Sequence, residues 1–317
     1  MALSKITNDL LALGESTSSL NLPKGTTAQR PSSPVAGMVR ENTDDNVIEY
    51  YNGTEWKQVL YAEQVVTVDY LVVAGGGTGG TINTYSPANA IGGSGGGGGL
   101  VTSYGTTSGG GSSSENPKLL DKGSTYNIVV GAGGAGTGPD AAGTTGSVGF
   151  DSSFDNISSL GGGGGGGNGS ESTDGGCGGG GKESNGIGGS GTTGQGYAGG
   201  TGSETGNYGG GGGGAGSAGS SRIGGNGLAV AITGSAVTYS TGGTSTLGTT
   251  NSSNEDPNTG NGSNGAGVTS GNGGSGVVIL RLLTSEYSGI YSGSGVTVDD
   301  QGEYTVLTYT QSGTYTA

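Results

Sequence analysis

The sequence predicts a mostly β protein with much irregular structure. We expect a short N-terminal helix, a small antiparallel β-meander, and a glycine-rich body of packed polyglycine II helices capped by a β-sheet. Glycine supplies 81 of the 317 residues, against a usual share of about 7%. Two apolar, strand-like segments, 66–77 and 273–283, enclose the glycine-rich part. Before it, short alternating runs are separated by strong turn signals.

Changes of composition divide the chain into four predicted parts. These are an N-terminal helical segment for attachment or oligomerisation, a β-meander, the polyglycine II domain, and a C-terminal β-segment that closes the body. Their ranges are 1–21, 22–61, 62–283 and 284–317.

The N-terminal helix is predicted from the spacing of apolar residues. Leu3, Ile6, Leu10 and Leu13 occupy the a and d positions of two heptads, and Gly14 is a suitable helix end. Two heptads are too short to be stable alone in water. The segment therefore needs a partner, which could be copies of itself, an anchoring peptide or a surface of its own domain.

The meander is predicted from three short runs, GMVREN, NVIEYY and TEWKQVL, with turns at 43–46 and at Asn52–Gly53. Its expected core is Val39, Ile48, Tyr50 and Trp56. A unit of this size buries little apolar area, so we expect neighbours, most simply symmetric copies, to stabilise it.

The glycine-rich body begins with Val65–Val73, which is apolar on both faces, as a strand buried on both sides should be. Segments 124–136 and 276–283 share this character, so the three are expected to form a small sheet from which the glycine runs project. The tail at 304–317 is expected to form a hairpin that turns at Ser312–Gly313 and closes the sheet.

Glycine-rich sequence without a collagen period is also typical of flexible linkers. An ordered body would need a source of free energy, because fixing a backbone costs about 1–2 kcal/mol per residue and glycine buries almost no apolar area. Backbone hydrogen bonds are the remaining source, at about 0.5–1.5 kcal/mol each. Segments with three residues per turn and no Cβ can bond neighbours on several sides, and we therefore predict a polyglycine II bundle.

Composition argues against several classes of function. The net charge is −14 with no basic patch, which argues against nucleic acid as a partner. No long apolar run or secretion signal is found, so no membrane insertion is expected. The single Cys177 cannot form an intrachain disulfide and is expected to be a small buried residue.

Catalytic residues are scarce. Histidine is absent, which excludes Ser/His catalysis and histidine metal sites. The carboxylate pairs Asp44–Asp45, Glu255–Asp256 and Asp299–Asp300 lie in turn contexts and are read as solvated polar groups. The many GxGxxG matches follow from composition alone. We therefore expect no enzyme activity, no cofactor and no metal site.

Tyrosines lie in the polar loops between the glycine runs. Tyrosine offers a large amphipathic contact at a low entropic cost, as recognition surfaces do. The candidate receptor-contact residues are Tyr85, Tyr104, Tyr197, Tyr208 and Tyr239. The alternative is that these rings only pack against glycine backbone. Arg222 and Lys182 are the isolated basic residues of the middle of the body, and no role is assigned to them.

Two parts of the chain resemble known families. Segment 22–59 is similar to a module common in structural and tail-fibre proteins of bacteriophages, especially marine ones. The body resembles the glycine-rich domain of phage tail-fibre proteins and adhesins, through DYLVVAGGG (69–77), YNIVVGAGGAG (126–136), FDSSF (150–154), GQGYAGG (194–200) and GGSGVVILRL (273–282). Related adhesins lie at the tip of the long tail fibres of T-even-like phages. The resemblance to them implies that the glycine runs form a polyglycine II sandwich and that the variable loops between the runs contact the host receptor.

The expected function is therefore that of a virion fibre protein or adhesin, located on the virion in a tail fibre or other external appendage. Its expected partners are other virion tail or fibre proteins, bound through the N-terminal part, and a host cell-surface glycan or outer-membrane protein. A homotrimer is expected from the heptads and from the resemblance. The alternative is a purely structural virion component, such as a head fibre, decoration or spacer. An ice-binding polyglycine protein and a depolymerase are weaker alternatives.

Overall fold

The computed structural model of the chain describes residues 22–59, 65–82, 90–138, 143–168, 170–246 and 251–317. The chain divides into two compact units, 1–63 and 64–317, which we describe separately. The predicted N-terminal helix, with Leu3, Ile6, Leu10 and Leu13, lies outside the described residues.

The first unit is a four-stranded sheet in the order β1-β2-β3-β4. Its strands are Lys24–Gly25, Val39–Asn42, Val47–Tyr51 and Trp56–Gln58, with the short 3-10 helix η2 at Thr27–Gln29. The three longer strands lie within the three predicted runs and pair antiparallel. The predicted turns are confirmed, with Asn46 and Gly53 in the left-handed region at φ 55° and 105°.

The predicted core of this unit is wrong. Val39, Ile48 and Tyr50 are 42%, 44% and 39% exposed and lie on the open face of the sheet. Strand alternation places Arg40, Asn42 and Glu49 on the other face, where all three are buried. The segment between β1 and β2 covers this polar face, because its backbone and side chains supply hydrogen-bond partners for the three buried polar groups.

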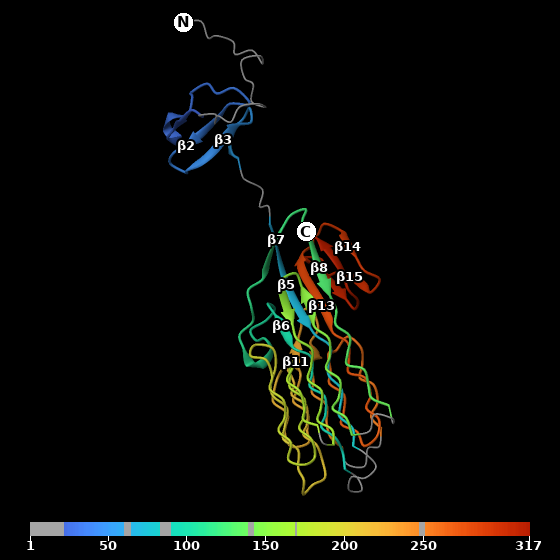
Figure 1. Ribbon diagram of the computed structural model, residues 1–317. Helices are drawn as coiled ribbons and strands as arrows, with labels where there is room; N and C mark the ends of the chain where they lie inside the picture. Colours follow the sequence, from blue (N-terminus) through green and yellow to red (C-terminus); the bar gives the residue numbers. More distant parts are fainter. Residues whose placement is uncertain (1–21, 60–64, 83–89, 139–142, 169, 247–250) are drawn as a thin grey trace, which may run out of the picture. The chain divides into compact units, whose positions relative to one another are not determined.

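The second unit contains two antiparallel sheets and one separate hairpin (Figure 1). The first sheet has the order β15-β16-β13-β5-β6. In that order its strands are Val296–Asp300, Tyr304–Tyr309, Val277–Leu283, Val65–Val73 and Leu100–Thr102. A further strand, β7 (Lys118–Asp121), pairs with the first residues of β5. The second has the order β10-β9-β8-β17-β14, with strands Ile157–Ser159, Ser152–Phe154, Thr125–Val129, Gly313–Thr316 and Ile290–Ser292. The hairpin is β11 (Leu228–Val230) with β12 (Val237–Tyr239), and short 3-10 helices lie at Gly109–Gly111 and Thr284–Glu286.

The two strands that enclose the glycine-rich part in the sequence are neighbours in the first sheet. β5 and β13 pair antiparallel, with Leu71 opposite Ile279. One apolar cluster joins the two sheets and includes Tyr70, Phe154 and Tyr309. A second cluster on β5 and β13 includes Cys177, which is buried, as predicted, and whose pKa burial raises to about 12.

The predicted hairpin at Ser312–Gly313 does not form. β16 pairs with β13 and β15 in the first sheet, whereas β17 pairs with β8 and β14 in the second. Tyr309 and Tyr315 are both fully buried in the cluster between the sheets. The tail therefore crosses from one sheet to the other, which buries both rings.

Between the strands, the glycine-rich segments run away from the sheets and turn back at a far end (Figure 1). They are held by backbone hydrogen bonds that recur every third residue. The N–H groups of Ala74, Gly77 and Gly80 donate to the carbonyls of Gly99, Gly96 and Gly93. Those of Gly75, Thr78 and Thr81 donate to Phe150, Ser147 and Thr144. Gly76 bonds a third neighbour at Gly274, so consecutive residues of one segment bond different neighbours.

This arrangement leaves no room for side chains. A methyl group at the buried Gly179 would overlap the carbonyl oxygen of Gly164 in a neighbouring segment, and most glycines of the body meet backbone atoms in the same way. Gly138 lies at the edge of the described part, is exposed, and has nothing near its missing Cβ. The close spacing of the segments therefore requires glycine at inner positions.

We predict that Gly179→Ala lowers the free energy of unfolding by about 3 kcal/mol or more, because rigid backbone must move to admit the methyl group. Gly138→Ala is the matched control and should be neutral. Urea unfolding of the two variants and the parent measures the difference. Equal midpoints for Gly179→Ala and Gly138→Ala would show that the segments are not closely packed.

Candidate functional site

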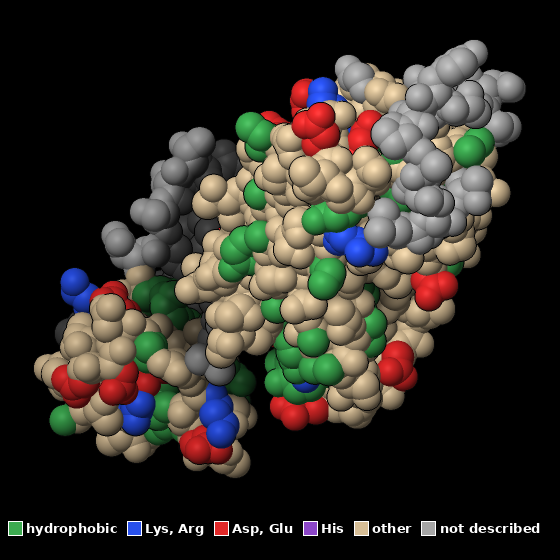
Figure 2. All heavy atoms as spheres, turned by 90° about the horizontal axis from the view of Figure 1, so that it is seen from below, with side chains coloured by type: hydrophobic (Ala, Val, Ile, Leu, Met, Phe, Trp, Pro, Cys, Tyr) green, Lys and Arg blue, Asp and Glu red, His purple; other side chains and the backbone are tan. Residues whose placement is uncertain are grey.

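The loops at the far end of the glycine segments are the first candidate site. Two of them, 183–186 and 203–208, are closed by backbone hydrogen bonds between residues close in sequence. The N–H of Gly186 donates to the carbonyl of Lys182, and Ser203 and Tyr208 each donate an N–H to the carbonyl of the other. Figure 2 views the molecule from this end, where most of the described surface of the body is backbone and uncharged polar side chains, with scattered hydrophobic side chains and separate acidic and basic groups. The face is therefore largely uncharged, with a few charges of both signs.

Polar contacts tie these loops to their neighbours. The side chain of Asn185 donates to Glu204 at 3.1 Å and accepts from the backbone N–H of Glu204 at 3.2 Å. Lys182 forms an ion pair with Glu171 at 2.7 Å. The two far-end loops are therefore fastened to each other through side chains as well as backbone.

Glu183 is the buried acid of this region. It is 6% exposed, and one of its carboxylate oxygens, Oε2, has no hydrogen-bond partner. Burial raises the pKa of Glu183 above its ordinary value, and the charge of Lys182 opposes this only in part. The fold therefore disfavours the charged form of this side chain.

The five candidate tyrosines do not form one surface. Tyr85 lies outside the described residues. Tyr208 is the last residue of the far-end loop 203–208. Tyr104 lies beside β6 and packs against the second apolar cluster, and Tyr197 follows a turn whose Gln195 bonds Leu160 and Ser158 next to β10. Tyr239 ends β12, is 5% exposed, and has its pKa raised by burial, so its ring is unavailable to a receptor.

Arg222 contacts Tyr208, the candidate tyrosine that lies in a described far-end loop. Its guanidinium carbon lies 5.3 Å from the centroid of the Tyr208 ring, and its Nε donates to the carbonyl of Ser245 at 3.2 Å. The backbone N–H of Ser245 donates in return to Arg222 at 2.9 Å. A hollow of about 360 Å³ lies here, lined by Ser220, Ser221, Arg222, Ile223, Thr244 and Ser245. Sequence reasoning noticed Arg222 but could not place it next to Tyr208.

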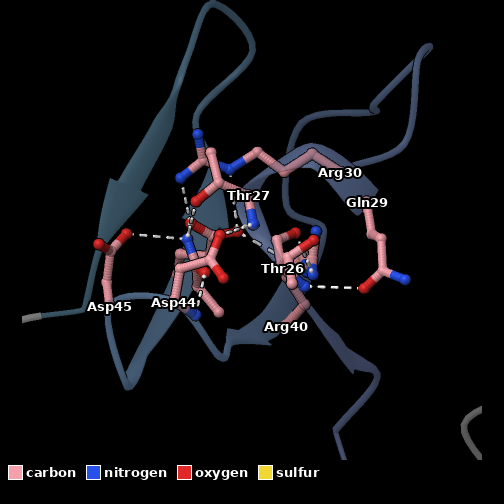
Figure 3. Close-up of polar contacts among 9 residues, drawn as sticks. Thr26, Thr27, Gln29, Arg30, Arg40, Asp44 and Asp45 are labelled. Carbon is pink, nitrogen blue, oxygen red and sulfur yellow. Dashed lines mark hydrogen bonds and ion pairs between the residues drawn. The ribbon is translucent and has the colours of Figure 1, made fainter.

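A second cluster of charged groups lies in the first unit (Figure 3). Glu49 accepts from Nε of Arg30 at 3.1 Å and lies 3.7 Å from Arg40, while the side-chain amide of Asn42 donates to it at 3.2 Å. The bond from Arg30 holds the pKa of Glu49 below its usual range, helped by Asn42. These charges compensate each other inside the unit, so the cluster stabilises the fold and offers little to a ligand.

The described residues contain no group of three or more His, Cys, Asp or Glu side chains placed to hold a metal ion. No described helix has the length and apolar character needed to span a bilayer.

Fold and surface together define a glycine-rich β protein in which backbone hydrogen bonds hold the body and polar loops close its far end. A family model described as a glycine-rich domain matches residues 54–283, and the chain belongs to this family. No curated protein and no solved structure matches the chain.

We predict that Glu183→Gln stabilises the protein at pH 7 by about 1 kcal/mol. Because burial favours the neutral acid, the folded protein binds the proton more tightly than the unfolded chain does, so stability falls as the pH rises above the ordinary pKa of 4.5. The amide removes this loss. Unfolding midpoints between pH 3 and 8 should show a gain that disappears below about pH 4.

Glu303→Gln, at an exposed position, is the control and should show no such gain. A Glu183→Gln variant that is less stable than the parent at pH 7 would contradict the burial of an incompletely solvated carboxylate.

Proposed function

We propose that the chain is a bacteriophage virion fibre protein or adhesin that attaches the particle to the host cell surface. Polar loops on a rigid glycine-rich scaffold would contact a host cell-surface glycan or outer-membrane protein. Membership of the glycine-rich domain family and the resemblance to tail-fibre proteins support this proposal. The observation that carries it is that backbone groups hold the glycine segments together. The polar loops at the far end of the segments are therefore available to contact a partner.

We infer further that the glycine segments are polyglycine II helices. A helix with three residues per turn directs consecutive N–H groups to three sides. The three-residue recurrence of partners for Ala74, Gly77 and Gly80, and the different partners of Gly75 and Gly76, support this geometry. Parallel neighbours follow the same rule, since Ser94 and Gly97 donate to Gly210 and Gly213.

Binding without catalysis is part of the same proposal. The sequence has no histidine, and among the described residues no second carboxylate acts on Glu183, the most buried acid of the far-end loops. A cleavage reaction on a host glycan would need two carboxyl groups facing one bond. Loss of viscosity or release of sugars from host polysaccharide on incubation with the purified protein would argue for a depolymerase.

The N-terminal part is proposed to attach to other virion proteins and to associate as a homotrimer. The open face of the first unit supports self-association, because Val39, Ile48 and Tyr50 lie next to each other on paired strands and stay exposed. Exposed apolar patches of this kind on a small sheet are typical of protein interfaces.

Purified protein is predicted to compete with phage particles for adsorption to susceptible cells. Tyr208→Ala should raise the concentration needed for half-inhibition about tenfold, since aromatic anchors dominate interface energies. Tyr291→Ala, on the exposed strand β14 of the second sheet, is the matched control. No competition by the parent protein would favour the purely structural virion component instead.

Light scattering of the purified protein should give the mass of three chains. Ile48→Lys places a charge on the open apolar face of the first unit and should convert the trimer to smaller species. Gln58→Lys places the same charge at an exposed position on the opposite face of the sheet and should not. A monomeric parent protein, or a trimer that Ile48→Lys leaves intact, would contradict the role assigned to this face.

A further inference from the structure

Arg222 differs from most basic residues of the chain in having no acidic partner. Seven ion pairs connect the other described cations, except Lys24, to carboxylates. The Nε of Arg222 is used by Ser245, but its two Nη groups form no ion pair or hydrogen bond within the described ranges. In a chain of net charge −14, a cation without a partner is unexpected.

The position of the guanidinium is fixed from two sides. Tyr208 offers a ring 5.3 Å from its central carbon, and Ser245 accepts from Nε. These contacts restrict the long side chain, so a ligand would lose less side-chain entropy on binding. The Nη groups remain as a pair of charged donors suited to two acceptor oxygens.

The walls of the hollow are suited to hydroxyl groups. Ser220, Ser221 and Thr244 line it beside Arg222 with hydroxyls that can still hydrogen-bond a ligand. The hydroxyl of Ser245 is buried and already bonds the carbonyls of Gly92 and Gly210. Ile223, largely exposed, adds an apolar surface at the rim. Hydroxyl partners, one apolar surface and a single fixed cation together match a sugar that carries one anionic group.

We propose that this hollow binds an anionic sugar, with the Nη groups of Arg222 bonded to its carboxylate or phosphate and the serine and threonine hydroxyls bonded to its ring hydroxyls. The inference rests on the proposed attachment function and names the ligand class of that surface. Each contact is weak alone. Repeated units of a surface polysaccharide, bound by several copies of the chain, would multiply the affinity without new contacts.

The overall negative charge of the protein does not oppose this binding at short range. Charges in water are screened over about 8 Å at physiological ionic strength, while the hydrogen bonds from Arg222 act at contact distance. We expect the net charge to slow the approach of a polyanion and to leave the contact itself intact.

The test uses the full-length protein labelled with ¹⁵N and follows the side-chain Nε–H resonances of arginine. The probes are digalacturonate, its methyl ester, glucose 6-phosphate and glucose. Digalacturonate or glucose 6-phosphate should shift the Arg222 resonance at millimolar concentrations. Comparing the two probes shows whether the site prefers a carboxylate or a phosphate. The methyl ester and glucose should bind at least tenfold more weakly.

Arg222→Gln should weaken binding of the anionic probe about ten- to hundredfold, and Arg222→Lys should restore it only in part because it keeps the charge and loses the paired donors. These variants lack the Arg222 resonance, so their binding is followed through the backbone amide resonances of the lining residues Ile223 and Thr244. Lys24→Gln removes a charge from the other unpaired cation and should change nothing. Unfolding midpoints identify any variant that fails to fold. Equal binding of charged and neutral probes, no binding of either anion, or unchanged affinity in Arg222→Gln would overturn the inference.

Adsorption of the same proteins to susceptible cells separates this inference from the proposed function. If the protein adsorbs to cells and no anionic sugar binds, the ligand class is wrong and the attachment function stands. If an anionic sugar binds at Arg222 and the protein does not adsorb, the attachment function fails and the site remains.

Discussion

Hydrogen bonds between backbone groups of neighbouring glycine segments are the interaction on which the second unit depends. Each bond contributes little, about 0.5–1.5 kcal/mol, but almost every residue of a segment makes one, and Gly75, Gly76 and Gly77 each bond a different neighbour. Because donor and acceptor belong to the backbone, the constraint on sequence is a negative one: inner positions must lack a side chain. Overlap of a Cβ at Gly179 with the carbonyl of Gly164 shows this constraint at one position.

A body made in this way needs an anchor, because backbone bonds that recur every third residue do not by themselves choose one register. The sheets supply it. Leu100, Cys177 and Ala215 come from different glycine segments and pack in the same apolar cluster as Val73 and Val277. Side chains at the sheet end therefore fix which segments are neighbours, and the backbone bonds extend that choice toward the far end.

Local patterns in the sequence predicted the strands well and their partners less well. Val65–Val73 and the segment at 277–283 are continuous apolar runs, and the three runs of the first unit alternate and end in strong turns. The hairpin predicted for 304–317 was wrong because alternating Tyr, Val and Thr residues are suited equally to a hairpin and to two strands in different sheets. In the structure, the second arrangement buries both Tyr309 and Tyr315. In the first unit, the apolar face was taken as the core because the sequence alone does not show that Arg30 and Arg40 converge on Glu49. The far-end surface was least predictable, since the segments there are held together by glycine backbone, which carries no side-chain identity.

The two arginine environments of the chain illustrate how charge is used differently in its two units. Arg40 is buried beside Glu49, and moving either group out of this compensated cluster would leave a charge without its partner. Arg222 is only half-buried, so water can solvate its free Nη groups and the fold does not need an acid there. Tyr208 and Ser245 hold this guanidinium in place, and no carboxylate among the described residues pairs with it, so its charge contributes little to the stability of the fold.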